Sequence, residues 1–292
     1  PMLYQLFSVI APVLTCAVIG YVWRKQGRPY DTSLVTTLVT NIGTPCLVFF
    51  TLIDTRIEAD AFLTMGAATF TTMVAFYVFY FVFLKAMKLS QKAFLSALAY
   101  GNTGNMGLPL CLLAFGDHGL ALAIAYFTVN VLCLFTVGVA VPAGATSPGA
   151  LLRLPILYAA LAALVVMVMG WTVPAPIVNT TRILSGLTVP LMLITLGVSL
   201  AGLGVKKLPQ AVLLSVMRLG VGFLVGWGVA ELFDFEGVAR GVLILQCAMP
   251  VAVFNFLFAE RYNNQPEEVA GMVVISTVLS FATLPFLLAF VM

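Results

Sequence analysis

Long apolar runs follow one another along almost the whole chain, and they limit the fold more than any other feature of the sequence. A transmembrane helix needs roughly 20 apolar residues, and ten runs reach about that length between charged or Pro- and Gly-rich breaks. The predicted spans are residues 2–23, 33–53, 60–84, 92–115, 119–141, 152–172, 181–203, 209–233, 238–260 and 267–291. We therefore expect an all-α integral membrane protein with ten transmembrane helices.

Composition excludes several other classes of protein. Hydrophobic residues make up 62% of the 292 residues and charged residues 9%, whereas soluble domains carry about 25% charged residues. The net charge of +3 is too small and too scattered for a nucleic-acid partner, and the runs are too long for outer-membrane β-strands. The five cysteines lie inside apolar runs without a C-x-x-C pair, which favours buried apolar packing over disulfides or a zinc site. The first run has no basic region or cleavage site before it, so we expect it to be retained as a span.

The distribution of Lys and Arg predicts the orientation, because cytoplasmic loops collect basic residues. With the N-terminus outside, the loops that face inside hold ten of the 14 basic residues. The loops on the opposite side hold three basic residues and six of the 11 acidic residues. The ten are Arg24, Lys25, Arg28, Lys85, Lys88, Lys92, Arg153, Lys206, Lys207 and Arg261. We expect a multi-pass protein of the cell inner (plasma) membrane with both termini on the non-cytoplasmic side.

Prolines recur at matching places in the two halves of the chain. Pro45 lies near the start of the second span and Pro190 at a similar place in the seventh. Pro109 in the fourth span and Pro250 in the ninth follow 64 and 60 positions later. Many secondary transporters consist of inverted repeats, and a repeat with an odd number of helices must be inverted in the membrane. The two expected five-helix repeats are residues 1–141 and 142–292.

The fourth and ninth spans contain most of the polar residues at membrane depth. The fourth reads Y-G-N-T-G-N-M-G-L-P-L from Tyr100 to Leu110, and its glycines and proline disfavour a continuous helix. The ninth reads L-Q-C-A-M-P-V-A-V-F-N-F, with Gln246 before Pro250 and Asn255 after it. Irregular backbone at this depth must line a cavity or lie buried in protein. Two broken helices that cross near the midplane would point free N–H groups and positive dipole ends at one place, and an anion could be held there without a buried lysine.

The motif N-T-G-N-M-G-L-P-L, which begins at Asn102 and is followed by A-F-G, resembles the fourth-helix motif N-T-x-x-M-G-x-P-L of the auxin efflux carrier family. The ninth-span Q-C-A-M-P, the F-x-F-A-E-R-Y-N that begins at Phe256, and Pro266 are similar to the same family's Q-A-x-x-P…F-x-F-A-x-x-Y-N…P. Weaker matches are P-C-L-V-F from Pro45 and T-L-G from Thr195. The chain is identified as a member of this family, which includes plant PIN-FORMED carriers and bacterial permeases named for malonate or malate.

The resemblance implies that broken helices 4 and 9 cross, as in bile-acid symporters and NhaA-type sodium–proton antiporters. Helices 1, 2, 6 and 7 would form a scaffold, and helices 3–5 and 8–10 a transport part that moves against it like an elevator. The resemblance also implies a homodimer built through the scaffold and an organic anion as substrate. The plant family's charged pair in the third helix has no counterpart here, and its long loop between helices 5 and 6 is reduced to about residues 142–151.

Matched residue by residue, the resemblance makes Asn102 the substrate-contacting asparagine, Gln246 the motif glutamine, and Pro109 and Pro250 the crossing prolines. Val48 stands where the plant proteins have a serine, and the missing hydroxyl argues against aromatic, auxin-like substrates. With the other polar groups at depth, the candidate substrate-binding residues are Val48, Asn102, Thr103, Asn105, Asn130, Gln246 and Asn255. The candidate helix-crossing residues are Gly104, Gly107, Pro109 and Pro250.

Each of the candidate amides also has a purely structural interpretation. Asn102 and Asn105 could do no more than satisfy backbone groups that the break frees, although polar groups at membrane depth favour a functional role. Asn130 could hydrogen-bond the fourth helix or complete the site. Asn255 could form an interhelical hydrogen bond.

Arg218 is the one basic residue clearly within a span. It could attract an anion or pair with Glu231 or another carboxylate. We favour the alternative, in which its guanidinium reaches back to the inner surface. His118, beside Asp117 at the outer end of the fourth span, is expected in a surface loop rather than in a proton relay.

The sequence as a whole predicts a secondary transporter that moves a small organic anion, a carboxylate, by elevator-like alternating access. The alternatives are a Na⁺- or H⁺-coupled symporter or antiporter of the related bile-acid or cation-antiporter type, and a channel or sensor on the same fold. An enzyme is not expected, because a single histidine and no intramembrane carboxylate pair provide neither a nucleophile with a base nor a metal site. We expect no cofactor and no metal site, although coupling to Na⁺ or H⁺ is possible.

Overall fold

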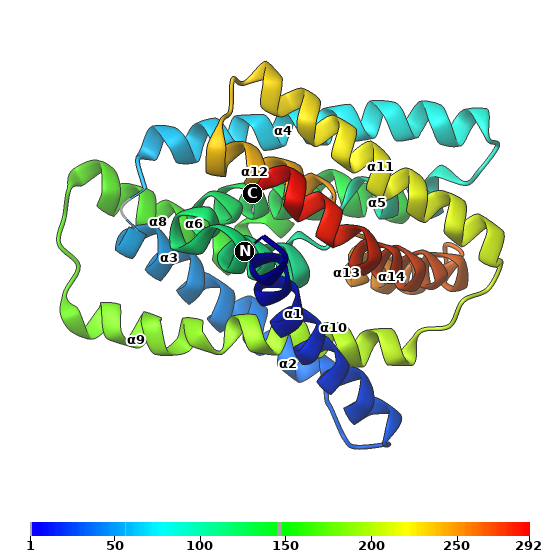
Figure 1. Ribbon diagram of the computed structural model, residues 1–292, viewed down its shortest axis with the longest axis horizontal. Coiled ribbons are helices and arrows are strands. Elements are labelled where there is room, and N and C mark those ends of the chain that lie inside the picture. The colour runs from blue at the N-terminus through cyan, green and yellow to red at the C-terminus, as the bar shows by residue number, and fades with distance from the viewer. Residues whose placement is uncertain (1, 56, 145–147) are drawn as a thin grey trace.

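The computed structural model describes residues 2–55, 57–144 and 148–292, and these residues form helices joined by short connections. Figure 1 shows the helices packed side by side, with α4 along one edge of the molecule and α9 and α10 along the other. The elements are α1 (Met2–Lys25), α2 (Thr32–Leu38), η1 (Val39–Gly43), α3 (Thr44–Thr55), α4 (Ala59–Ala86), α5 (Gln91–Ala99), η2 (Thr103–Gly107), α6 (Leu108–Cys133), η3 (Leu134–Gly138), α7 (Val139–Ala143), η4 (Pro148–Arg153), α8 (Pro155–Met169), α9 (Ala175–Gly186), α10 (Thr188–Gly202), α11 (Leu208–Leu232), α12 (Gly237–Cys247), α13 (Val253–Arg261) and α14 (Pro266–Val291). The predicted all-α class is confirmed.

Local signals in the sequence set several helix starts. Asp31 and Ser90 precede α2 and α5, and each side chain accepts a hydrogen bond from a backbone N–H of the first turn, which would otherwise lack a partner. Pro155, Pro209 and Pro266 lie in the first turn of α8, α11 and α14. Proline is tolerated there because its missing N–H has no helical acceptor to lose.

Seven helical stretches in the described part of the chain are long and apolar enough to cross a membrane, by length and composition. They are Tyr4–Lys25, Thr32–Thr55, Ala59–Ala86, Thr103–Ala143, Ala175–Gly202, Leu208–Leu232 and Pro266–Val291. The helices Pro155–Met169 and Gly237–Cys247 are apolar but shorter. Seven differs from ten because parts of two predicted spans share the stretch Thr103–Ala143, and because the sixth and ninth predicted spans contain the two short helices. The count of ten therefore stays a prediction.

Three helix pairs pack along much of their length. α1 packs against α10, and α3 packs against α8 and α9; elsewhere α11 contacts α14 and α12, and α4 contacts α6 and α5. Gly20 and Gly197 allow the α1–α10 contact, because a Cβ on either would overlap a carbonyl oxygen of the facing helix, that of Ile194 or that of Ala17. Small residues that let backbones approach are typical of helix packing in membranes.

Three segments, η1, η2 and η3, are wound as π-helix. Each is five residues long and closes with a hydrogen bond from an N–H to the carbonyl five residues earlier. Such wide turns are rare and often mark functional sites. η2 coincides with the predicted break in the fourth span, whereas η1 and η3 had no sequence signal that we recognised.

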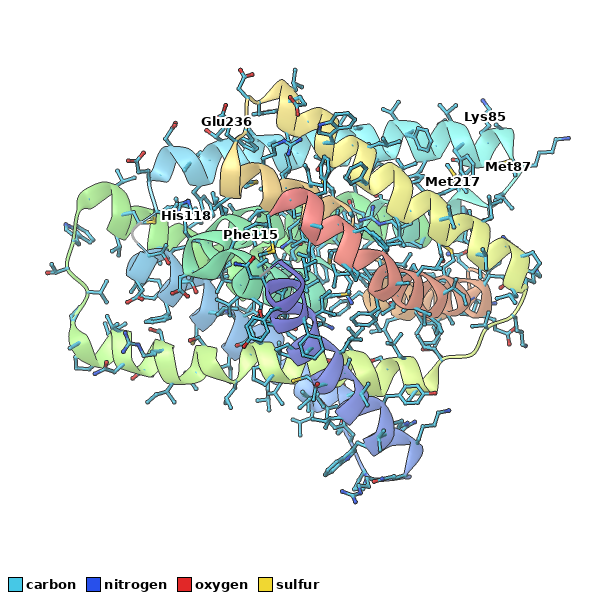
Figure 2. All side chains as sticks on the ribbon, viewed as in Figure 1. Lys85, Met87, Phe115, His118, Met217 and Glu236 are labelled. Carbon is cyan, nitrogen blue, oxygen red and sulfur yellow. The ribbon has the colours of Figure 1, made fainter. Side chains whose placement is uncertain are left out.

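Exposed charged side chains occur toward both ends of the molecule. Figure 2 shows Lys85 at one end of the long axis, and His118 and Glu236 toward the other. All 11 acidic residues lie in the described part of the chain, and none is buried. Large apolar side chains such as Phe70, Val78 and Phe286 are exposed, as expected of a surface that faces lipid.

Candidate functional site

Two interrupted helices meet at the one β-type bridge in the described part of the chain. α5 ends at Ala99 and η2 begins at Thr103, while α12 ends at Cys247 and α13 begins at Val253. Between these helices the two connecting segments run antiparallel, with a bridge between residues 101 and 251. Both interruptions therefore lie at the predicted positions, and the two segments contact each other directly.

Backbone hydrogen bonds join the two extended segments. The N–H of Asn102 donates to the carbonyl of Pro250 at 2.6 Å, and the N–H of Ala252 donates to the carbonyl of Tyr100 at 3.3 Å. The Asn255 side chain donates a further hydrogen bond, of 3.0 Å, to the Tyr100 carbonyl. Since buried backbone groups need partners, Asn255 has at least the structural role that the sequence left open.

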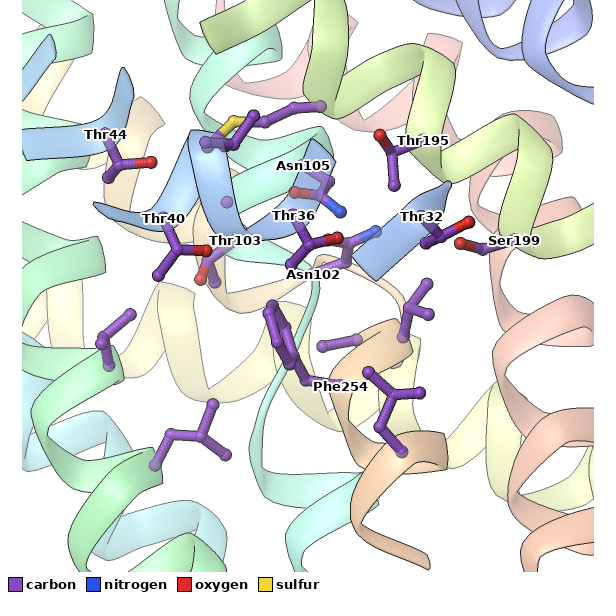
Figure 3. A pocket seen from close by; sticks show the side chains of 18 of the residues that line it. Thr32, Thr36, Thr40, Thr44, Asn102, Thr103, Asn105, Thr195, Ser199 and Phe254 are labelled. Carbon is purple, nitrogen blue, oxygen red and sulfur yellow. The ribbon is translucent and has the colours of Figure 1, made fainter. Parts of the chain in front are cut away.

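A cavity of about 360 Å³ lies beside this crossing (Figure 3). One wall comes from η2, α6 and the start of α13, and the other from α2, η1, α8 and α10. Apolar side chains such as Phe127, Phe254 and Met192 provide most of its surface. The polar lining residues are Arg24, Thr32, Thr36, Thr40, Thr44, Asn102, Thr103, Asn105, Asn130, Thr195 and Ser199.

The amides of η2 and α6 line one side of the cavity. Asn102 Nδ2 is buried and has no hydrogen-bond partner in the protein. Asn130 donates through Nδ2 to the Thr103 hydroxyl at 3.1 Å, which leaves its buried Oδ1 unpartnered. An unsatisfied buried polar group costs about 1–3 kcal/mol, so each of these two atoms destabilises the fold unless another group supplies a partner. Asn105 lines the same wall and is half-buried.

Hydroxyl groups line the opposite side, and the sequence analysis missed them. Four threonines, Thr32, Thr36, Thr40 and Thr44, follow one another at four-residue spacing and all line the cavity. Four residues of α-helix rotate by about 40° more than a full turn. Threonines at this spacing would therefore move gradually around an α-helix and away from the cavity. The wider turn of η1 (Val39–Gly43) reverses this drift between the third and fourth threonine. The regular i, i+4 spacing of threonines was the available signal.

A second row of hydroxyls comes from α10. Thr195 and Ser199 line the cavity, and Figure 3 labels both. Tyr30 and Thr195 share a hydrogen bond of 2.7 Å between their hydroxyl oxygens. Burial raises the pKa of Tyr30, so this hydroxyl stays neutral. Thr195 belongs to the T-L-G motif, but the motif did not indicate where its side chain points.

Several predicted site residues lie outside the cavity lining. Val48 is fully buried in α3, and Gln246 is fully buried in α12. Pro109 and Pro250 are buried at the helix interruptions and do not line the cavity, and neither does Asn255. Any role of these residues in binding substrate stays a prediction.

Two glycines of η2 permit close contacts. A Cβ on Gly107 would overlap the amide of Gln246, and a Cβ on Gly104 would press on the ring of Phe127. Gly104 also lines the cavity, whereas Gly107 does not. Both polar atoms of the Gln246 amide are buried without a hydrogen-bond partner. This side chain, which lies against Gly107, is therefore a further unsatisfied polar group beside η2.

The expectation that Arg218 reaches the inner surface is wrong. Its side chain is 1% exposed and donates hydrogen bonds to four carbonyl oxygens, those of Leu98 at 2.9 Å, Cys247 at 3.0 Å, Met249 at 3.0 Å and Ala99 at 3.5 Å. The physical reason is that α11 packs against α12 and α5, so the guanidinium finds backbone acceptors at the crossing without leaving the protein interior.

The proposed pairing of Arg218 with Glu231 is also absent. Glu231 is exposed and accepts hydrogen bonds from Trp227 and, at 3.4 Å, from Arg240. His118 is exposed, as expected for a surface position. Among the cavity-lining residues Arg24 is the one ionisable side chain, and the described residues contain no cluster of three metal-binding side chains.

A multi-span helical protein with a cavity beside two paired helix breaks has the architecture of a membrane transport protein. The chain belongs to the membrane transport protein family, whose members are auxin efflux carrier-like transporters. The family's sequence model matches it twice, over residues 5–147 and 145–288. The protein is thus a transporter in a lipid bilayer and not an enzyme.

Relatives of similar length carry transporter names. An uncharacterized transporter of Methanothermobacter thermautotrophicus is 26% identical over 95% of this chain and 96% of its own. An uncharacterized transporter of Methanocaldococcus jannaschii is 25% identical over 94% of both chains. A protein of Rhizobium meliloti named "putative malonate transporter" is 25% identical over 97% of this chain and 95% of its own.

Proposed function

We propose that the protein carries a small organic anion, a carboxylate, across the cell inner (plasma) membrane and binds it at the crossing. The observation that supports this most is the buried, unpartnered Nδ2 of Asn102, a residue of a cavity lining that holds no acidic residue. An amide N–H donates to a carboxylate oxygen, and the absence of acids from the lining avoids repulsion. Arg24 at the rim of the cavity adds a positive charge on the path of an anion.

Helix ends support the same assignment. η2 continues into α6, and α13 begins beside it, so two helix N-termini lie at the crossing. The first turn of a helix leaves N–H groups without helical acceptors and carries about half a positive charge. An anion is therefore stabilised there by dipoles, and a buried lysine is not needed.

The volume of the cavity favours a small substrate. Ligand pockets span about 300–1,000 Å³, and about 360 Å³ lies at the lower end. The Rhizobium meliloti relative carries malonate in its name, so short dicarboxylates are the first compounds to test. Threonine hydroxyls opposite Asn102 could donate to a second carboxylate group.

Ten spans in two inverted repeats remain our proposal for the membrane arrangement. The stretch Thr103–Ala143 has 41 residues, which as one helix would extend about 60 Å, twice the roughly 30 Å of a bilayer core. Gly116, at φ 67° and ψ −161°, breaks the helix inside this stretch. The two family matches divide the chain near the proposed boundary between residues 1–141 and 142–292. The packing of α1 on α10 would then repeat as the packing of α8 on α3.

The position of the cavity supports elevator-like alternating access. Its walls come from the two proposed parts, the scaffold (helices 1, 2, 6 and 7) and the transport part (helices 3–5 and 8–10). Movement of the amide wall past the threonine wall would take a bound anion from one side to the other. A homodimer through the scaffold is the assembly that the family resemblance implies.

Cation coupling is the second candidate, and unsatisfied acceptors favour it. The buried oxygens Asn130 Oδ1 and Gln246 Oε1 lie near Thr103 and Gly107 of η2 without hydrogen-bond donors, and such oxygens suit Na⁺. Uptake by proteoliposomes under a Na⁺ gradient alone, a pH gradient alone and a voltage alone separates the possibilities. Uptake that responds to voltage only would reject coupling.

A binding and uptake screen tests the proposed function. Purified protein is heated with malonate, other dicarboxylates, short monocarboxylates and indole acids, and the compounds that raise its Tm are then tested for uptake by proteoliposomes. We expect a short carboxylate to raise the Tm and to show saturable, slow uptake. Non-saturable flux would indicate a channel, and no response to any carboxylate would contradict the proposal.

A further inference from the structure

One buried charge sits where the two interrupted helices end. Arg218 Nη1 donates to the carbonyl of Leu98 in the last turn of α5, and Nη2 donates to the carbonyl of Cys247, the last residue of α12. Nε donates to the carbonyl of Met249 in the connection after α12. A single guanidinium thus binds the C-terminal ends of both half-helices.

We propose that Arg218 determines the anion specificity of the transport site without contacting the substrate. Helix C-termini carry about half a negative charge each and N-termini the opposite. At a crossing of two interrupted helices these charges would nearly cancel. Arg218 neutralises the two C-terminal ends, so the two N-terminal ends dominate the potential in the cavity. The inference rests on the proposed function, in which this cavity binds a carboxylate.

Gly101 shows how close the charge lies to the cavity. This residue lines the cavity, and a Cβ built on it would overlap Nη2 of Arg218. Only the backbone of Gly101 therefore separates the guanidinium from the cavity that Asn102 also lines. The overlap explains why the residue before Asn102 has no side chain.

No acid cancels this charge. A buried ion is costly unless it is paired and hydrogen-bonded, yet none of the 11 acidic residues is buried. Carbonyl dipoles and the ring of Phe76, whose centroid lies 5.0 Å from Cζ, stabilise the guanidinium instead. These groups are neutral overall, so the net positive charge remains, and its field is strong in a medium of low dielectric constant.

The competing explanation is a purely structural tether, in which Arg218 only holds the two half-helices together. The preference of the site for charged over neutral ligands distinguishes this tether from a role in anion specificity. The affinities of malonate and of neutral malonamide are measured with reconstituted protein, by competition with a radiolabelled carboxylate for uptake and by shifts in Tm. Arg218→Met removes the charge, and Arg218→Lys keeps it. We expect Arg218→Met to reduce the malonate-to-malonamide affinity ratio by about tenfold or more, and Arg218→Lys to retain most of it.

Three further variants keep the test decisive if Arg218→Met does not fold. Phe76→Glu places a carboxylate beside the guanidinium and should reduce the ratio while Arg218 keeps its hydrogen bonds; Phe76→Gln is its neutral control. Ser276→Ala loosens the same crossing without changing charge, because the Ser276 hydroxyl accepts from the N–H of Val251. A structural tether predicts that every variant changes both affinities by the same factor, and that result would overturn the inference. A wild-type protein that does not prefer malonate over malonamide would instead refute the proposed function.

Discussion

Asn102 and Pro250 are joined by a hydrogen bond of 2.6 Å in which the backbone N–H of Asn102 donates to the carbonyl oxygen of Pro250. This bond ties the two interrupted helices together, and it uses backbone atoms alone. The side-chain amide of Asn102, which has no partner in the protein, is therefore not needed for the bond. Substrate binding and the integrity of the crossing can be tested separately at this residue.

The threonine wall should contribute to substrate affinity. Thr36→Val and Thr40→Val keep the volume of each side chain and remove one hydroxyl. Because one neutral hydrogen bond contributes about 0.5–1.5 kcal/mol, we expect KM for uptake to rise about two- to tenfold. Thr37→Val is the matched control, since Thr37 is exposed and its hydroxyl donates to the carbonyl of Ser33 in its own helix. Equal effects at Thr36 and Thr37 would show that the wall does not contact substrate.

The threonine wall could not be predicted from the sequence, whereas the amide wall could. The amides Asn102, Asn105 and Asn130 were predictable, because strongly polar side chains are conspicuous in an apolar run. Threonine is common in membrane helices and can donate to its own backbone, as Thr37 does, so Thr36 and Thr40 carried no comparable signal. Which face of the second span meets the fourth is decided by tertiary packing and by the π-helical turn η1.

The close contact between Gly107 and Gln246 should exclude a larger side chain at position 107. Gly107→Ala would force its Cβ into the Gln246 amide, and overpacking of this kind costs about 1–3 kcal/mol. We expect a lower Tm in detergent, with partial recovery in the double variant Gly107→Ala/Gln246→Ala. Gly228→Ala is the control, because nothing lies near a Cβ at that position. A Tm for Gly107→Ala that matches the wild type would contradict the contact.

Arg218 illustrates a different limit of the sequence. Its distance along the helix from Pro209 indicated its depth, but depth does not tell whether a long side chain turns to the surface or to the interior. The carbonyl acceptors Leu98, Cys247 and Met249 become available only when α5 and α12 end beside α11. The breaks were predictable from Gly and Pro, whereas the residue that satisfies them was not.

Labelling from each side of the membrane should test the predicted orientation. Lys85 and His118 lie toward opposite ends of the molecule and are exposed (Figure 2). In protein whose five native cysteines are replaced, a membrane-impermeant maleimide should modify His118→Cys in intact cells and Lys85→Cys only after permeabilisation. The opposite pattern would reverse the orientation. Labelling of both sites in intact cells would contradict a two-sided arrangement.

Uptake of radiolabelled malonate by proteoliposomes that contain Asn102→Ala tests the central claim most directly. Asn41→Ala serves as the control, because Asn41 is exposed and does not line the cavity. We predict that Asn102→Ala loses saturable uptake while its Tm stays close to that of the wild type, and that Asn41→Ala keeps both. Unchanged KM and rate in Asn102→Ala would contradict a carboxylate site at the crossing.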